Sequence, residues 1–175
     1  MTDRLTALAV EIEEHVATSG WDQPPRLYAL VPTAELIAAD PALGAELGLS
    51  AEATPPGALT PVEQEDLPPG PLDEALPRIG WSADVAGCAL VHEAVVLPPD
   101  VESTAPAEAD EDALNAWASA HPDRRDVRLA VAVIRDGTRG AVVRVRADDG
   151  TQADDIVVDP DLAPGLADAL VATLH

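Results

Sequence analysis

The chain has 175 residues and a net charge of −22, and only 2% of its residues are aromatic. This length suffices for one hydrophobic core, which must be built from Leu, Val, Ile and Ala because Phe is absent. The negative charge argues against binding to a nucleic-acid backbone, and a single cysteine excludes an internal disulfide.

The first predicted element is an amphipathic helix over residues 3–18. Its apolar stripe has helical spacing and consists of Leu5, Leu8, Ala9, Ile12 and Val16. The acid pair Glu13 and Glu14 is expected on the solvent face, because most acid pairs in a chain with 32 acidic residues are solvated. Trp21 follows the helix, and we expect it to cover the open edge of the core.

A short strand is predicted over 26–31, followed by a helix over 34–39 that Thr33 caps. Residues 48–71 are rich in proline and have no sustained period, which indicates a long surface insertion. Within this insertion, Thr60 to Glu63 resembles a capping box with proline at the first helical position, so one helical turn is expected there. A further helix is predicted from Pro71 to Ile79.

The run 85–97 is apolar and predicts a strand near the centre of a sheet, and 100–109 has the acidic, proline-bearing composition of a linker. Asp110 or Asp112 then caps a helix that ends at His121-Pro122.

The stretch 126–147 alternates with a period of two on either side of Asp136-Gly137, which predicts a β-hairpin. A loop with an odd number of residues, 136–138 or 136–140, keeps one face apolar and places Val131 opposite Val143 or Val145. The second face carries small Ala residues and suits close approach by a helix.

A short strand at 156–158 and a helix over 163–174 complete the predicted elements. The order of helices and strands indicates an α+β fold, with an antiparallel sheet of about four to five strands and helices packed on one face. We expect residues 1–175 to form a single domain, with the insertion at about 48–71 and the linker at about 100–109.

The sequence contains no recognisable arrangement of catalytic residues. Cys88 and His92 lie on one predicted strand, ~13 Å apart at ~3.3 Å per residue, which is too far for a nucleophile and its base. The chain has no HExxH or CxxC motif, and 148–155 (DDGTQADD) lacks the spacing of a calcium loop. We therefore predict no catalytic, metal-binding or cofactor-binding residue, and a protein that is not an enzyme.

Arginine is concentrated around the predicted hairpin, where seven of the ten Arg residues lie. One hypothesis is a basic surface for an acidic partner, with Arg128, Arg144 and Arg146 as the candidate partner-binding residues. The alternative is that these side chains only balance the charge of an acidic protein locally.

Four segments resemble an uncharacterised actinobacterial protein family: WDQPPRLYALVPTAEL (21–36), LTPVEQEDLP (59–68), LDEALPRIGW (72–81) and VAGCALVHEAVVLPP (85–99). The resemblance implies no established activity. Members of that family are often encoded near a PDZ-domain protease-like protein and a large membrane protein, which implies an accessory role at a membrane complex. At the level of fold, the element order also resembles the small α+β scaffold of type III secretion chaperones.

These observations favour a non-catalytic protein-binding, adaptor or chaperone-like accessory domain. The partner is expected to be a protein, with a membrane-associated complex or a second copy of the chain as options, and without nucleic acid or direct membrane insertion. A small enzyme that uses scattered acids and His92, or a small-molecule sensor, is the alternative. Residues 1–20 lack the apolar region of a signal peptide, so a cytoplasmic location is expected.

Overall fold

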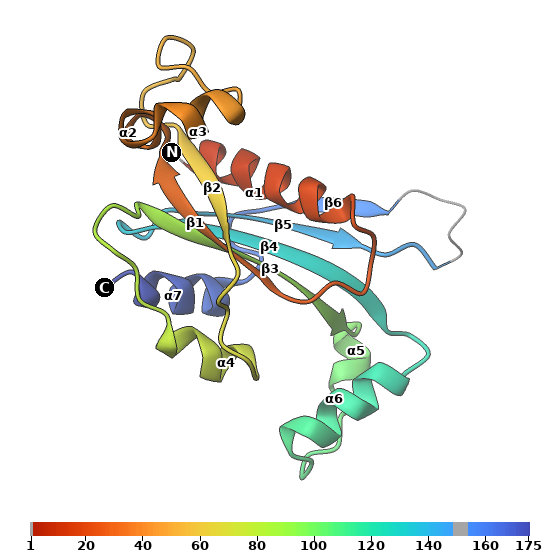
Figure 1. Cartoon of the computed structure of the whole chain (residues 1–175). Coiled ribbons are helices and arrows are strands. Elements are labelled where there is room, and N and C mark those ends of the chain that lie inside the picture. Colours follow the sequence, from red (N-terminus) through yellow and green to blue (C-terminus); the bar gives the residue numbers. More distant parts are fainter. Residues whose placement is uncertain (1, 149–153) are drawn as a thin grey trace.

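The fold is a six-stranded antiparallel sheet with helices on both faces (Figure 1). The structure, a computed structural model, describes residues 2–148 and 154–175. Across the sheet the strands follow the order β2-β1-β3-β4-β5-β6. The strands are β1 (Arg26–Pro32), β2 (Leu59–Gln64), β3 (Gly87–Val96), β4 (Arg125–Ile134), β5 (Arg139–Val145) and β6 (Asp155–Val158). The helices are α1 (Thr2–Ala17), α2 (Thr33–Ala39), α3 (Pro41–Glu46), α4 (Leu72–Ala75), the 3-10 turn η1 (Leu76–Arg78), α5 (Pro99–Glu102), α6 (Glu111–Ala120) and α7 (Pro164–Thr173).

Helix α1 covers one face of the sheet. All five residues of its predicted apolar stripe are buried, which confirms the helix and its orientation. They pack against small side chains of β4 and β5, among them Ala130, Ala132 and Val142. The Ala-rich face of the hairpin therefore receives a helix, as the sequence predicts.

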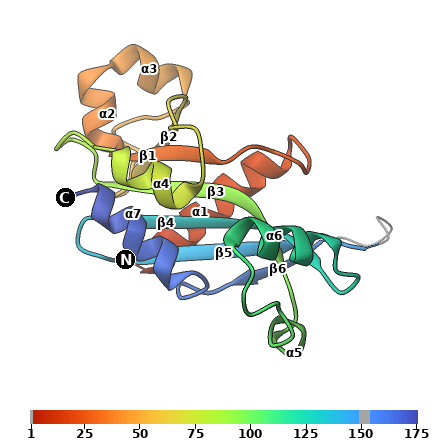
Figure 2. The same cartoon turned by 90° about the horizontal axis from the view of Figure 1, so that it is seen from below.

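Helix α7, together with α4 and η1, covers the opposite face, as Figure 2 shows. Leu170 of α7 and Leu174, which directly follows the helix, belong to a second core with Val131, Val133 and Leu90. The prediction of helices on one face only is therefore wrong. Strand β4 buries apolar side chains on both of its faces, and each buried face needs its own cover.

The sheet has six strands, where four to five were predicted, because β2 lies inside the proline-rich insertion. The helical turn expected from Thr60 to Glu63 is wrong for the same reason. Thr33 N donates to Ala58 O, so the residues of β2 that bond to β1 are the even-numbered ones. Pro61 lies between them and would direct its missing N–H away from β1, so it removes no hydrogen bond from the ladder.

The central hairpin has an odd loop, which confirms that part of the prediction, but its register differs. Ile134 N donates to Thr138 O at 3.0 Å, which leaves Arg135 to Gly137 as a three-residue loop. Gly137 adopts a φ of 87°, a conformation that few residues other than glycine take readily. Val131 consequently pairs with Ala141, two residues before the nearer predicted partner, and this even shift preserves both faces.

Two small helical groups extend from the sheet at opposite ends, α2 with α3 and α5 with α6 (Figure 1). Asp110 caps α6 as predicted, because its Oδ1 accepts a hydrogen bond from Ala113 N at 2.8 Å. Thr33 does not cap α2; its hydroxyl pairs instead with the hydroxyl of Thr60 at 2.9 Å and ties β1 to β2. Helix α5 begins in the segment before the predicted linker and enters it.

Candidate functional site

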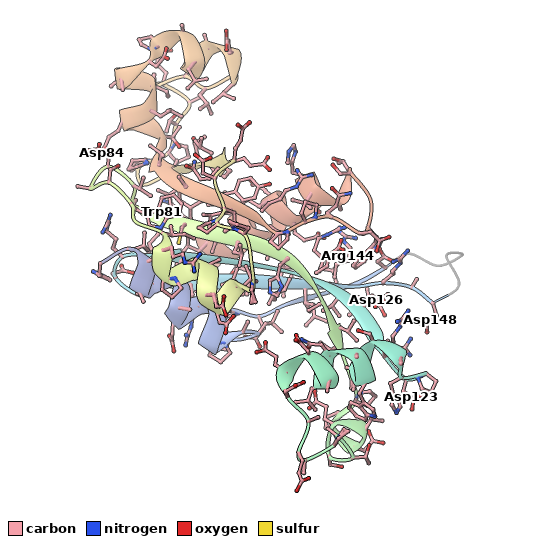
Figure 3. The ribbon with its side chains drawn as sticks, turned by 60° about the horizontal axis from the view of Figure 1, so that its bottom comes forward. Trp81, Asp84, Asp123, Asp126, Arg144 and Asp148 are labelled. Carbon is pink, nitrogen blue, oxygen red and sulfur yellow. The ribbon has the colours of Figure 1, made fainter. Side chains whose placement is uncertain are left out.

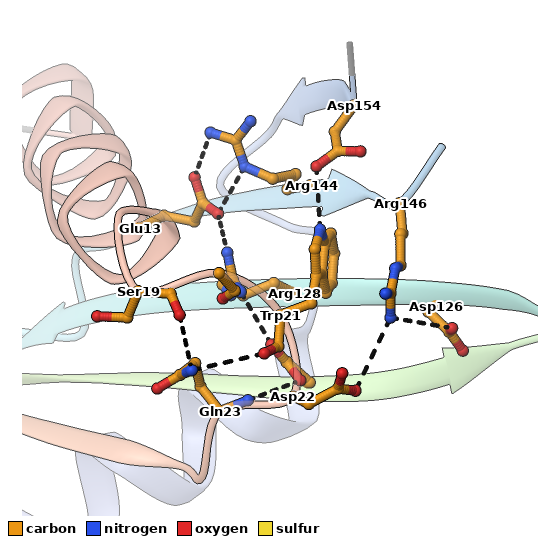
Figure 4. Close-up of polar contacts among 12 residues, drawn as sticks. Glu13, Ser19, Trp21, Asp22, Gln23, Asp126, Arg128, Arg144, Arg146 and Asp154 are labelled. Carbon is orange, nitrogen blue, oxygen red and sulfur yellow. Dashed lines mark hydrogen bonds and ion pairs between the residues drawn. The ribbon is translucent and has the colours of Figure 1, made fainter. Parts of the chain in front are cut away.

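The charged groups of the central hairpin meet α1 at one end of the sheet. Arg128 and Arg144 are direct cross-strand partners on the α1 face, and Glu13 of α1 lies between them (Figure 4). Glu13 accepts two hydrogen bonds from Arg144, both 2.8 Å long, and lies 3.4 Å from Arg128 Nη1. Glu13 and Arg128 are each only 1% exposed. We call Glu13, Glu93, Arg128 and Arg144 the buried ion cluster.

The guanidinium group of Arg128 has three partners in addition to Glu13. Its Nη2 donates to Glu93 Oε1 at 2.9 Å and also to the carbonyl of Gly20. Its guanidinium carbon lies 4.5 Å from the centre of the Trp21 ring, within the range of a cation–π interaction. Two glutamates thus balance two arginines, and the cluster has no net charge to offer a partner.

Trp21 covers the outer end of this cluster. Its Nε1 donates to Asp154 Oδ2 at 3.1 Å, and Arg146 lies 5.5 Å from the ring centre (Figure 4). Arg146 in turn contacts Asp22 at 3.8 Å and Asp126 at 3.9 Å. Trp21 was expected to cover the open edge of the core. Its ring lies against the guanidinium groups of Arg128 and Arg146, and it thereby connects the chain after α1 to β4 and to the residue that follows β5.

The structure separates the three candidate partner-binding arginines by exposure. Arg128 is buried and its two terminal nitrogens are bound within the protein, so its side chain is not on the surface of the described structure, and its role in partner binding stays a prediction. Arg144 is half-buried, and its hydrogen bonds to Glu13 raise its pKa above the ordinary value. Only the side chain of Arg146 is substantially exposed, at 41%. In Figure 3, Arg144 lies with Asp126 and Asp148 at the end of the sheet away from Trp81.

A polar cavity of about 530 Å³ lies beside the cluster, between the ends of β3 and β4 and helix α6. Its lining includes Trp21, Glu93, Asn115, Arg124 and Arg146. Its lining contains both acidic and basic side chains, so its charge favours no single class of ligand. The small-molecule sensor alternative calls for an apolar cavity with a few inward polar groups, and the lining of this one is mainly polar.

Cys88 and His92 do not form a catalytic pair. Both lie on β3, as predicted, and Cys88 is fully buried, with its Sγ 3.7 Å from the carbonyl of Leu170 and 3.8 Å from the hydroxyl of Thr173. Burial raises the pKa of the Cys88 thiol to about 11 and lowers the pKa of His92. Neither group is brought against the other, and the prediction that the protein is not an enzyme stays a prediction.

Cys88 is therefore expected to be unreactive in the folded protein. A rise in pKa from 9.0 to about 11 lowers the thiolate fraction near pH 8 roughly 100-fold, and burial also blocks access. The reaction with Ellman's reagent should be at least ~100-fold slower in buffer than in denaturant. Because the chain has one cysteine, the absorbance reports this site alone. Similar rates in both conditions would contradict the buried placement.

Strand β6 forms the second edge of the described sheet. The strand itself is confirmed at Asp155–Val158, but all four of its residues are exposed. Ile156, Val157 and Val158 are 44%, 47% and 48% exposed, and they form a continuous apolar edge. Three consecutive β-branched residues between Asp155 and Asp159 are the only sequence signal, and such a run is equally typical of a buried strand.

Metal sites and membrane-spanning helices can be assessed for residues 2–148 and 154–175. Within these ranges, no group of three or more His, Cys, Asp and Glu side chains could hold a metal ion. Most of the candidate calcium segment 148–155 lies outside the described residues. No helix in the described part is both long and apolar enough to cross a membrane.

Comparisons with known proteins identify the family of the chain but find no curated relative and no solved structure that matches it. Neither the curated proteins nor the solved structures contain a match, so the resemblance to type III secretion chaperones stays a prediction. A family model described as "PPA1309-like protein" matches residues 5–175, which is almost the whole chain. The chain therefore belongs to the PPA1309-like protein family.

Proposed function

We propose that this protein is a non-catalytic protein-binding adaptor, and that its partner adds a strand to the free edge of β6. The observation that carries the proposal is the apolar edge strand, with three consecutive exposed β-branched residues. Exposed edges of this kind are templates for pairing with another chain, and natural proteins usually protect them. No strand among the described residues pairs with this edge, and its apolar centre contains no proline, so it is better explained as a binding site than as inert surface.

The hydrogen-bonding groups of β6 support this geometry. Asp159 N donates to Ala141 O, and β6 pairs with β5 in the register Val143–Val157. In an antiparallel ladder alternate residues bond to the same neighbour, so Asp155 and Val157 bond to β5. Ile156 and Val158 then direct their N–H and C=O groups away from the sheet, and no described strand pairs with them.

The side chains of β6 supply apolar area on both sides of an added strand. Ile156 and Val158 lie opposite Arg144 and Val142, on the α1 face, whereas Val157 lies on the α7 face. A partner strand would therefore bury apolar groups above and below the sheet. Main-chain hydrogen bonds would provide affinity, and the side-chain contacts would provide selectivity.

The other edge of the sheet is protected in a way that β6 is not. On β2 the outward-facing residues are Leu59, Pro61 and Glu63, so the missing N–H of Pro61 lies at the middle of that edge. Glu63 adds a charge beside it, which contacts Arg26 at 3.6 Å. This difference between the two edges favours β6 as the binding edge.

A proline at position 156 tests the proposal. Ile156→Pro removes one outward N–H and no hydrogen bond to β5, so the fold should be retained and the partner lost. The matched control is Ile156→Thr, which keeps the N–H and the β-branched shape. Tagged forms of the wild type and both variants would be purified from the native cell and their partners quantified by mass spectrometry.

We expect one set of partners to be recovered with the wild type and the Thr variant, and at least ~10-fold less with the Pro variant, because both the edge donor and the extended backbone are needed. Circular dichroism would verify that the Pro variant folds. Equal recovery of all partners with the Pro variant would remove β6 as the binding edge.

A further inference from the structure

The residues that flank the apolar edge of β6 indicate the chemistry of its partner. Asp155 and Asp159 bracket Ile156, Val157 and Val158, and both aspartates are exposed. Neither forms an ion pair with any residue in 2–148 or 154–175. We infer that the segment which pairs with β6 is an extended stretch with a short apolar centre and a Lys or Arg on each side. This inference rests on the proposed function.

The neighbouring acids differ from these two aspartates. Asp154 is engaged by Trp21 and by the N–H of Ala147, and Asp161 lies 3.0 Å from Arg139. Of these neighbouring acids, only Asp161 is paired with an arginine. Asp159 Oδ1 accepts a hydrogen bond from Asp161 N at 2.8 Å, but among the described residues neither Asp155 nor Asp159 has a cationic partner. Each of these would lie opposite one residue of an added strand, and opposite charges at such cross-strand positions stabilise pairing.

A second copy of the chain fits this edge poorly. The antiparallel register that pairs the most apolar groups is centred on Val157, with Ile156 opposite Val158 of the other copy. It also places Asp155 directly opposite Asp159 at both ends, and like charges opposite each other are destabilising. Each copy additionally carries a net charge of −22, which adds repulsion at longer range. Charge complementarity thus favours a basic segment over a homodimer.

The test uses two short capped peptides that share one apolar pattern, TTKVTVKTT and its acidic counterpart TTEVTVETT, each with a fluorescent label. Binding to the full chain is measured by fluorescence anisotropy at physiological salt. Two opposite-charge pairs replace two like-charge pairs, so the basic peptide should bind at least ~10-fold more tightly. The double variant D155N/D159N should reduce that preference to about threefold or less, because only the general charge of the chain remains.

Matched controls separate the edge from general electrostatic attraction. The variant E65Q/D66N removes two exposed acids next to the other edge strand and should keep the full preference. Ile156→Pro should abolish binding of the basic peptide, since the pairing uses the outward backbone groups. A basic peptide that still binds the Pro variant, or an equal loss of affinity in both double variants, would overturn the inference.

Three other results would each overturn the inference that the partner segment is basic. Equal affinity for the two peptides, lost in Ile156→Pro, would overturn the basic-partner inference and leave strand addition standing. Binding of neither peptide would overturn both proposals. Concentration-dependent dimerisation in sedimentation experiments, lost in Ile156→Pro, would identify a second copy as the occupant and overturn the inference.

Discussion

Replacing Glu13 by alanine is expected to lower the free energy of unfolding by about 3–5 kcal/mol. The substitution leaves Arg128 buried with only the more exposed Glu93 as a counter-charge, and it removes both hydrogen bonds from Arg144. Burying an incompletely paired charge is among the few changes that cost so much. Urea denaturation followed by circular dichroism would measure the loss.

The matched control is Glu14→Ala, one residue along the same helix. Glu14 is exposed, so its removal should change stability by no more than about 0.5 kcal/mol. If both variants unfolded at the same urea concentration, the buried ion cluster would contribute nothing beyond an ordinary surface acid.

A triple variant separates two quantities: the net stability that the buried ion pairs contribute, and the cost of leaving a buried charge without its partner. Replacing Glu13 by Leu and both Arg128 and Arg144 by Met removes all three charges at similar volume. Because desolvation offsets most of the attraction in a buried ion pair, this variant should be more stable than Glu13→Ala by at least ~1 kcal/mol. A triple variant less stable than the single one would indicate that the ion pairs are strongly favourable by themselves.

The burial of Glu13 could have been anticipated in part. Ala9, Glu13 and Val16 follow helical spacing, so Glu13 belongs to the margin of the apolar stripe, whereas Glu14 points away from it. The expectation that both acids are solvated was therefore wrong for Glu13. What the sequence does not contain is the partner: the Arg128–Arg144 pair is brought under α1 only by the packing of a helix onto strands more than a hundred residues away.

Local sequence patterns predicted most of the helices and strands, but fewer of the contacts between them. The stripe of α1, the cap of α6 and the odd loop of the hairpin depend on short-range chemistry, and each is confirmed. Strand β2 was missed because its proline resembles a loop signal until the direction of the missing N–H is known. Which face each helix covers, and which edge remains free, depends on long-range packing that periodicity alone does not encode.

The second large effect is expected at Gly140, where the backbone of α1 lies directly against β5. A Cβ atom at this position would lie 2.3 Å from Thr6 N, 2.5 Å from Leu5 C and 2.6 Å from Thr6 Cα. All three are backbone atoms, so no side-chain rotation relieves the clash and α1 must move away from the sheet. Gly140→Ala should therefore lower the free energy of unfolding by at least about 1–3 kcal/mol, the usual range for overpacking.

This substitution also links the helix to the ion cluster, since α1 carries Glu13 and any outward shift lengthens its bonds to Arg144. The control is Gly165→Ala in α7, where no atom lies within 4 Å of the added Cβ. There the better helix former should leave stability unchanged or raise it by up to about 1 kcal/mol. Urea titrations of the two variants should therefore move the unfolding midpoint in opposite directions, or move it only for Gly140→Ala. Equal midpoints would mean that α1 does not lie against β5 as closely as these distances require.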